Sequence, residues 1–206
     1  KSYVDNDQLA GQVVLVLRRG RIAYARANGM QDIAAGIPMS TDTMFRIASQ
    51  TKAIVSTGIM ILHERGALDI SHPLERYIPE WEDMQVAVSN DDGGYSLEPS
   101  RRSITLRNLL THTGGMSYGS GPAADKWEEA GFQGWYFADR NEPVGDTIAR
   151  MASLPLDEHP GERWIYGYNT DILGAVIEKA SGMDLNSFLR QEIFEPLDMN
   201  DTHFYL

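Results

Sequence analysis

The sequence has no cysteine among its 206 residues. Disulfide bonds, thiolate catalysis and cysteine-based zinc sites are therefore excluded. The chain also lacks a long hydrophobic run, because its longest candidate, residues 54–62, is interrupted by Ser56, Thr57 and Gly58. A membrane-spanning helix needs about 18 or more apolar residues in succession, so we expect no membrane span.

The chain has few basic side chains relative to acidic ones: it contains 18 Lys and Arg and 29 Asp and Glu, which gives a formal net charge of −11 at pH 7. Such a surface repels phosphate backbones, so we expect no nucleic-acid partner. The two basic clusters, residues 18–21 and Arg101–Arg102, fit exposed turns. The histidines form no metal-ligand pattern and no glycine-rich phosphate loop is present, so we expect neither a metal nor a cofactor.

The N-terminal part of the chain has the pattern of a β-hairpin. Gln12–Leu17 is a continuous β-branched and apolar run, which suits a strand buried on both faces. Residues 18–21 supply a turn with Gly20, and Ile22–Asn28 alternates between apolar and polar residues. We therefore expect two antiparallel strands here.

Most of the remaining chain has helical periodicity, and its middle is poor in strand pattern, with a loop at Asn90–Gly94. The sequence contains no internal repeat and no linker. A hairpin followed by many helices predicts an α+β protein. The predicted helices are Ser49–Arg65, Leu74–Ile78, Leu106–Thr111 capped by Thr105, Pro143–Ser153, Asn169–Ser181 closed by Gly182, and Leu185–Phe194 capped by Asp184.

The sharpest chemical feature is Ser49-Gln50-Thr51-Lys52 at the start of the first long helix. A spacing of three places the Ser hydroxyl and the Lys ammonium on one helical face. A lysine can act as the base for a serine nucleophile when its pKa is lowered, and the helix N-terminus and apolar neighbours favour that lowering. The spacing alone is weak, because Ser49 could instead cap the helix while Lys52 is solvated.

The chain resembles the serine β-lactamase-like superfamily, which includes class C β-lactamases, penicillin-binding D-peptidases and family VIII carboxylesterases. Four segments carry the resemblance and occur in the expected order over nearly the whole chain. They are Phe45–Lys52, Ile104–Gly115, Pro160–Gly174 and Glu195–Thr202. This ordered set is much more specific than a single Ser-x-x-Lys motif.

The resemblance implies a Ser-Lys-Tyr catalytic set made of Ser49, Lys52 and Tyr166. The Asn position of the family's Tyr-x-Asn motif falls on Tyr168, a departure from the β-lactamase pattern that is similar to the carboxylesterase branch. We take Tyr168 and Trp135 as candidate substrate-binding residues. Tyr168 could instead be a buried aromatic residue, and the aromatic segment 127–137 could line an acyl pocket or form a satellite core.

Gly115-Met116-Ser117-Tyr118-Gly119 has the form of a second serine-hydrolase motif, the Gly-x-Ser-x-Gly nucleophile elbow. That elbow requires a strand before the serine and a helix after it. Here a predicted helix ending at His112 precedes the motif and a glycine-rich segment follows it, so we do not expect Ser117 to be the nucleophile. We expect His112 to bond a backbone group at its helix end rather than a metal.

We therefore predict a serine hydrolase that acts on small-molecule carboxylic esters through an acyl-enzyme intermediate. The alternatives are a class C-like β-lactamase or a D-stereospecific peptidase and, from a different class, a non-catalytic protein with the penicillin-binding fold. Ester, nitrocefin and fluorophosphonate assays separate these three.

The resemblance also implies a β-lactamase/transpeptidase-like fold, with an antiparallel sheet flanked by helices and a mostly helical domain. We expect residues 1–70 to hold the hairpin and the nucleophile helix, 71–180 the mainly helical domain, and 181–206 a helix and a return to the sheet. The family's third motif is not found in residues 167–206, where a strand is expected to begin near Thr202. We therefore expect a C-terminal remainder of the same polypeptide to complete the sheet, either as a separate chain or as a further segment.

Overall fold

The computed structural model describes residues 2–138, 140 and 142–204. The chain folds into two compact units, Lys1–Ile47 and Ala48–Leu206. In the described part of the chain, no helix has both the length and the apolar character that crossing a membrane requires. The three-part domain division expected from the sequence stays a prediction.

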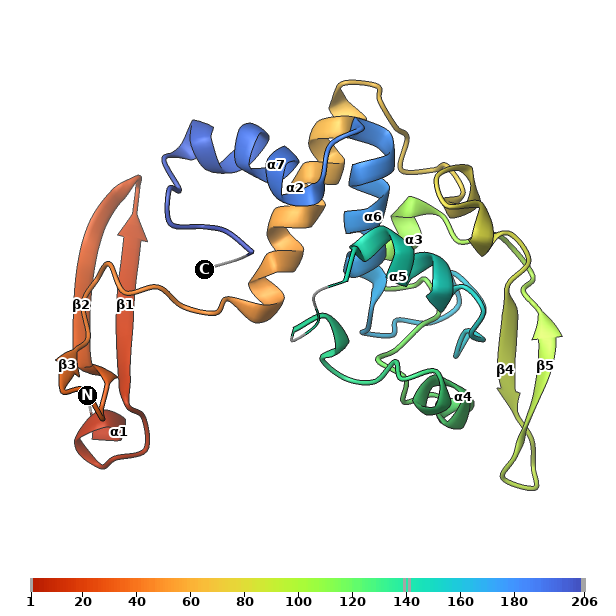
Figure 1. The fold of residues 1–206 in the computed structure, drawn as a ribbon, viewed down its shortest axis with the longest axis horizontal. Coiled ribbons are helices and arrows are strands. Elements are labelled where there is room, and N and C mark those ends of the chain that lie inside the picture. Colours follow the sequence, from red (N-terminus) through yellow and green to blue (C-terminus); the bar gives the residue numbers. More distant parts are fainter. Residues whose placement is uncertain (1, 139, 141, 205–206) are drawn as a thin grey trace. The chain divides into compact units, whose positions relative to one another are not determined.

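The first unit is built on the predicted hairpin (Figure 1). Helix α1 (Ser2–Asp5) precedes a three-stranded antiparallel sheet in the order β1-β2-β3. Its strands are β1 (Gly11–Arg18), β2 (Arg21–Asp32) and β3 (Ile37–Pro38). Arg19 and Gly20 form the turn between β1 and β2 with φ angles of +50° and +72°, the backbone that two-residue hairpin turns favour.

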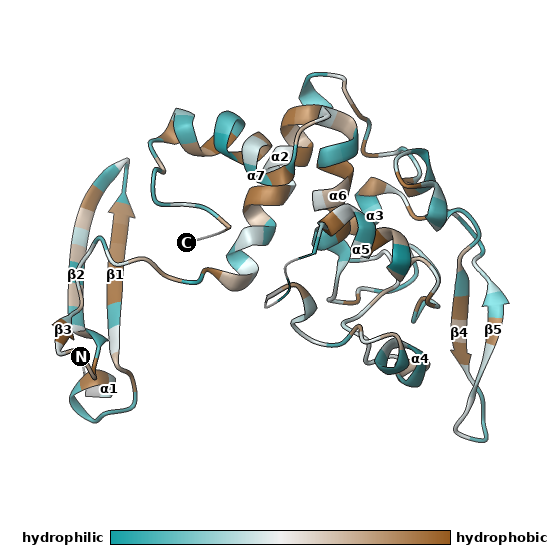
Figure 2. Ribbon diagram, viewed as in Figure 1, coloured by the Kyte–Doolittle hydropathy of each residue, from teal (hydrophilic) through white to brown (hydrophobic). Residues whose placement is uncertain are grey.

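The predicted burial of β1 on both faces is wrong within this unit. Leu15, Val16 and Leu17 have exposed fractions of 55%, 47% and 63%. The reason is that, among the described elements, β1 packs mainly against its neighbour β2, so no layer of this unit covers these side chains. Figure 2 shows the hydrophobic residues along β1.

The second unit is mainly helical. Its helices are α2 (Thr51–Glu64), α3 (Leu106–Leu110), α4 (Ala124–Glu129), α5 (Val144–Met151), α6 (Asn169–Ser181) and α7 (Leu185–Leu189), and α7 continues into a π-helical turn, Arg190–Phe194. Short 3₁₀ turns occur at Ala48–Gln50, Leu74–Arg76, Pro79–Trp81, Tyr136–Ala138 and Glu195–Leu197. The helical segments predicted from periodicity and capping are thus found, with α6 matching its predicted bounds.

Helix α6 forms the centre of this unit and contacts α2, α3, α5 and α7. Figure 1 shows α2 and α6 side by side. Five apolar side chains of α6 are completely buried, namely those of Ile172, Leu173, Ala175, Val176 and Ile177. Because several helices pack on this one helix, its N-terminal residues are held in a fixed position relative to the start of α2.

The sequence missed a second hairpin formed by β4 (Gln85–Ser89) and β5 (Tyr95–Pro99). The predicted loop 90–94 is the connection between these strands. The signal is weak because each strand has only five residues; β5 alternates over Tyr95–Glu98, but β4 holds three apolar residues in succession, at 86–88. The strand expected near the C-terminus is absent from Thr202–Phe204, and residues 205–206 lie outside the described part.

Candidate active site

The start of α2 brings Ser49 and Lys52 together. Ser49 lies in the 3₁₀ turn that leads into α2, and Lys52 lies in the first turn of that helix. Lys52 Nζ donates to Ser49 Oγ across 3.5 Å. Ser49 does not cap α2, because the N-cap is Gln50 and makes no side-chain capping bond. Ala48, just before Ser49, has a φ of +44°, so the turn that presents this serine is strained.

Tyr166 reaches the same serine from the segment before α6. Its hydroxyl donates to Ser49 Oγ across 2.6 Å. The hydrogen bond with Ser49 and the neighbouring Lys52 ammonium lower the pKa of the Tyr166 phenol, although partial burial opposes them. Lys52 Nζ lies 4.7 Å from the centre of the Tyr166 ring. Ser49, Lys52 and Tyr166 therefore form one connected cluster.

The predicted lowering of the Lys52 pKa is wrong for this arrangement. Burial does disfavour the charged ammonium, but hydrogen bonds to Tyr118 and Tyr166 outweigh it, and the pKa of Lys52 is raised. The lysine is consequently an ammonium in the resting site. Of the two side chains bonded to Ser49, it is the Tyr166 phenol whose pKa is lowered.

Tyr118 is a member of this cluster that the sequence did not single out. Lys52 Nζ donates to its hydroxyl across 3.0 Å, and burial raises the pKa of this phenol, which keeps it neutral. Its ring meets that of Tyr166 edge-on, with centroids 5.7 Å apart. The only sequence signal for Tyr118 is its place inside the Gly-x-Ser-x-Gly segment, directly after Ser117.

Ser117 itself is buried and is used to shape a turn. Its backbone N–H donates to Asp157 Oδ2 across 2.7 Å, and its Oγ accepts from the N–H of Ser120 at 3.0 Å. In the part of the chain that the structure describes, no strand directly precedes this serine and no helix directly follows it. These contacts orient the neighbouring Tyr118 rather than expose a second nucleophile.

Gly167 explains how Tyr118 and Tyr166 come to share one site. A Cβ atom at this position would lie about 2.5 Å from Met116 O and from the backbone carbonyl of Ser117. Only glycine allows the two chain segments to approach so closely. The approach sets the tyrosine that follows Ser117 beside the tyrosine that precedes Gly167.

The two candidate substrate-binding residues lie in different environments. Tyr168 is only 1% exposed, and its hydroxyl donates to Gly134 O across 3.0 Å. Its ring packs against those of Tyr118 and Trp127. Trp135 is 77% exposed. This placement supports a packing role for Tyr168, and substrate contact by either residue stays a prediction.

Of the two alternatives considered for the aromatic segment 127–137, core packing holds for its first half, and the acyl pocket stays a prediction. Trp127 and Phe132 belong to the buried core, with 1% and 4% exposure. Trp127 Nε1 donates to Pro155 O, which satisfies its buried N–H. The first half of the segment is thus core, whereas Trp135 remains accessible.

Asp171 is a further carboxyl group close to this cluster, in the first turn of α6. Burial raises its pKa to about 6, and the charge of Lys52 opposes that rise. Within the described residues, no group of three or more His, Asp or Glu side chains is placed to hold a metal ion. The Asp171 carboxyl group thus lies near the hydroxyl and ammonium groups of the cluster.

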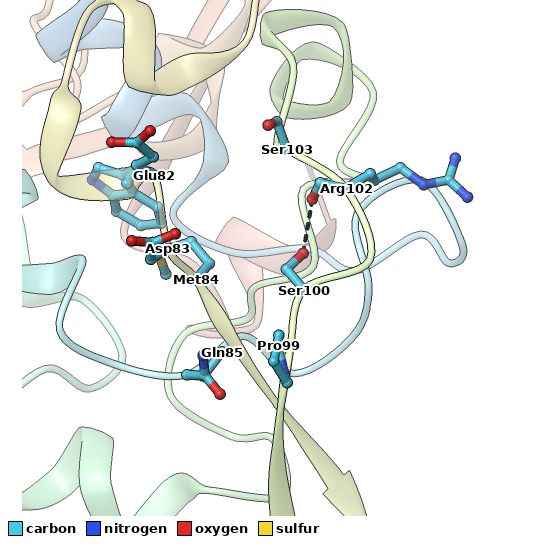
Figure 3. Close-up of a pocket in the computed structure, with 9 residues that line it drawn as sticks. Glu82, Asp83, Met84, Gln85, Pro99, Ser100, Arg102 and Ser103 are labelled. Atoms are coloured by element: carbon cyan, nitrogen blue, oxygen red, sulfur yellow. Dashed lines mark hydrogen bonds between the residues drawn. The ribbon is translucent and has the colours of Figure 1, made fainter.

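A cavity of about 270 Å³ lies at the base of the β4–β5 hairpin (Figure 3). It is lined by polar residues of both strands and their flanks, including Glu82, Asp83 and Arg102. Ser100 Oγ donates to Arg102 O at its edge. None of the clustered residues around Ser49 lines this cavity, so it is separate from the candidate active site.

The chain has the β-lactamase/transpeptidase-like fold. Its features here are an antiparallel hairpin sheet, a mainly helical unit, and a serine and a lysine one turn apart at the start of a long helix. The chain belongs to the Beta-lactamase family, whose profile matches residues 1–206.

Relatives within this family include both hydrolases and acyltransferases. Esterase EstB of Burkholderia gladioli is 36% identical over 201 residues, covering 96% of this chain and 47% of the esterase. The ML-236A carboxylate methylbutanoyltransferase mlcH of Penicillium citrinum is 34% identical over 214 residues, covering 100% of this chain and 50% of that protein.

Solved structures similar to this chain also include a hydrolase with acyltransferase activity. EstCE1, described as a hydrolase with promiscuous acyltransferase activity, matches with a TM-score of 0.80 and 28% identity over 96% of this chain and 49% of its own. Unliganded simvastatin synthase LovD from Aspergillus terreus matches with a TM-score of 0.76 and 31% identity over 96% of this chain and 50% of its own. The chain thus spans about half the length of the proteins that it matches.

Proposed function

We propose that this protein hydrolyses carboxylic esters of small molecules through an acyl-enzyme intermediate on Ser49. The observation that carries the proposal is the 2.6 Å hydrogen bond between Ser49 Oγ and the Tyr166 hydroxyl, beside the Lys52 ammonium. A nucleophile, a base and a charge that stabilises the base are thereby within contact distance of one another. The similarity to an esterase adds support from the family.

In the acylation step, the phenolate of Tyr166 accepts the Ser49 proton while Oγ bonds to the ester carbonyl carbon. Electrons of the carbonyl double bond move to its oxygen, and the Ser49 backbone N–H is one donor to that oxyanion. The bond to the alcohol oxygen then breaks, and Tyr166 returns the proton to the leaving alkoxide. Lys52 stays an ammonium throughout and stabilises the phenolate electrostatically.

Deacylation repeats these transfers with water as the nucleophile. Tyr166 accepts a proton from the water, the hydroxide oxygen bonds to the acyl carbon, and the bond to Ser49 Oγ breaks. The proton returns to Ser49, and the carboxylic acid leaves. No redox partner or cofactor is required for these steps to balance.

The environment of Tyr168 favours an ester as the substrate over a β-lactam or a peptide. In the penicillin-recognising relatives the corresponding Asn contacts the substrate amide, whereas Tyr168 is buried and uses its hydroxyl to bond Gly134 O. A site without that amide contact loses part of its recognition of amide substrates. β-Lactamase or D-peptidase activity is therefore the second choice.

Acyl transfer to an alcohol is a further candidate, because mlcH is a methylbutanoyltransferase by name. An acyl-enzyme on Ser49 can be intercepted by an alcohol in place of water. Adding a primary alcohol to the ester assay tests this: formation of the new ester at the expense of free acid would assign transfer as well as hydrolysis.

The test of the main proposal compares Ser49→Ala with Ser117→Ala on short p-nitrophenyl esters, in the natural full-length polypeptide. We expect Ser49→Ala to lose turnover and fluorophosphonate labelling and Ser117→Ala to keep both. The reverse pattern would overturn the assignment. Nitrocefin turnover faster than ester turnover would favour a β-lactamase, and failure to label the parent protein would favour a non-catalytic member of the fold.

We also propose that a further segment of the polypeptide completes the sheet and supplies the second oxyanion donor. The exposed apolar side chains of β1 support this, because a sheet with one such face open to water is marginally stable. Mass spectrometry of the denatured natural protein tests it. A single 23.0 kDa species with full activity would contradict the proposal.

A further inference from the structure

His112 lies in a strained position beside the candidate active site. It follows α3 and has a φ of +55°, in the left-handed region that is unfavourable for a residue with a side chain. Its carbonyl accepts from the N–H of Ile165 across 2.7 Å. The strained turn is thus bonded directly to the segment that carries Tyr166.

The ring of His112 packs against that of Tyr166. Their centroids are 4.9 Å apart, and the ring planes are tilted by 37°. Trp164 meets the imidazole edge-on at 6.0 Å. The phenol that donates to Ser49 is therefore braced on one face by the imidazole, and the position of the Tyr166 hydroxyl depends on how that imidazole is held.

Asn169 fixes the protonation state of the imidazole. It is completely buried, and its Nδ2 lies 3.2 Å from His112 Nδ1, 3.4 Å from Met116 O and 3.3 Å from Ile165 O. The two carbonyl oxygens can only accept, so the amide nitrogen of Asn169 must face them as a donor. The amide nitrogen cannot accept, so a proton on His112 Nδ1 would face N–H groups without an acceptor. We therefore place the single proton of the neutral ring on Nε2.

The surroundings also disfavour a second proton on this ring. Within the described part of the chain, the titratable groups that face His112 are Lys52 from α2 and Tyr166 from the segment before α6. Burial, together with the charge of Lys52, lowers the pKa of His112. An imidazolium would set an N–H at Nδ1 against the amide N–H of Asn169 and would place a second cation beside Lys52.

We propose that Asn169 holds His112 in the neutral Nε2–H tautomer, and that His112 in this state is a positioning residue for Tyr166. The inference rests on the role proposed above for Tyr166. It adds that the orientation of the phenol toward Ser49 is set by an imidazole that neither accepts nor donates a proton in the reaction.

The first test is ¹⁵N NMR of the natural full-length polypeptide with labelled histidine, which reports the proton on each ring nitrogen. We expect His112 to show the Nε2–H tautomer at neutral pH and to titrate below the ordinary histidine range. His63 is an internal control in the same spectrum, because its Nδ1 faces the carbonyl oxygen of Leu68 at 3.3 Å and must carry the proton. The resonance of His112 is assigned by its loss in His112→Gln.

A proton on His112 Nδ1 at neutral pH would overturn the proposal, whatever the activity of the protein. Asn169→Asp should have the opposite effect to Asn169 on the protonation of His112, since a carboxylate opposite Nδ1 favours the imidazolium. We expect it to raise the pKa of His112 above that in the parent protein. Because the wild-type spectrum decides the tautomer, the test does not depend on this buried variant folding.

The second test is kinetic and addresses the positioning of Tyr166. We expect His112→Gln to lower kcat about ten- to a hundredfold with little change in KM, the effect of misplacing one catalytic group. Rates are expressed per fluorophosphonate-labelled site, so a smaller folded fraction does not count as lost kcat. An unchanged kcat would refute the positioning role, whereas activity retained in Ser49→Ala would refute the proposed function instead.

Discussion

Lys52 Nζ lies 3.0 Å from the hydroxyl of Tyr118, closer than the 3.5 Å that separates it from Ser49 Oγ. The ammonium is therefore held chiefly by a half-buried neutral phenol and only loosely by the predicted nucleophile. This arrangement leaves Ser49 Oγ free to follow the Tyr166 hydroxyl during proton transfer, while the cation stays in place.

Removing the Tyr118 hydroxyl tests this relationship. We expect Tyr118→Phe to lower kcat/KM about ten- to a hundredfold, because a hydrogen bond to a charged group contributes about 1.5–3 kcal/mol. The loss should be measured with a p-nitrophenyl ester across a range of pH. Tyr95→Phe is the matched control, since the Tyr95 hydroxyl bonds Asp125 outside the site. Equal rates in both variants would argue against a role for Tyr118.

Adding a methyl group at Gly167 should separate the two segments that carry the tyrosines. We expect Gly167→Ala to destabilise the protein by about 1–3 kcal/mol, since backbone atoms that cannot rotate away lie within about 2.5 Å of the new Cβ. We also expect nearly complete loss of ester turnover. Urea unfolding and kcat/KM are the measurements.

Gly145→Ala is the control for this prediction. Its nearest neighbour is Glu178 Oε2 at 3.6 Å, an ordinary contact in helix α5. Alanine there should be neutral or stabilise the helix by about 0.5–1 kcal/mol. If Gly167→Ala matched this control, the close approach would not be required for the site.

Tyr168→Phe distinguishes packing from substrate contact. The variant keeps the buried ring and removes the hydrogen bond to Gly134 O. We expect the free energy of unfolding to fall by about 1 kcal/mol with KM for esters unchanged. A large change in KM at unchanged stability would instead support direct substrate binding by this residue.

The raised pKa of Asp171 leads us to expect that the stability of the protein depends on pH. Its pKa is raised from 3.8 to about 6 in the folded protein, so the folded state binds this proton more tightly than the unfolded state does. The resulting stabilisation is fully present below 3.8 and is lost as the pH rises through about 6.

We therefore expect Asp171→Asn to be more stable than the parent above about pH 7 and to lose that advantage near pH 4. Urea unfolding at several pH values measures the difference. Asp146→Asn, at an exposed position in the first turn of α5, is the control. The same pH dependence in parent and Asp171→Asn would contradict the prediction.

The sequence predicted the features that depend on local pattern. Periodicity and caps located α6 and Gly182, and Thr105 does cap α3 with a reciprocal bond to Asn108. The ordered motifs led to the family, and Ser49, Lys52 and Tyr166 lie together as the resemblance implied. Their catalytic roles stay predictions.

Features that depend on the meeting of distant segments could not be predicted. Tyr118 joins the site because a backbone approach at Gly167 brings its turn beside Lys52, and no spacing in the sequence encodes that approach. The direction of the Lys52 pKa likewise depends on two phenols from other segments. The β4–β5 hairpin was missed because each of its strands has only five residues.

The hydrogen bond from Tyr166 to Ser49 spans 117 positions of the chain. Interactions of such long sequence separation form after local helices, because a long loop must be closed first. During synthesis the chain exposes Ser49 well before Tyr166 has left the ribosome. In a nascent chain Ser49 therefore lacks its Tyr166 partner until the later segment has folded back onto α2.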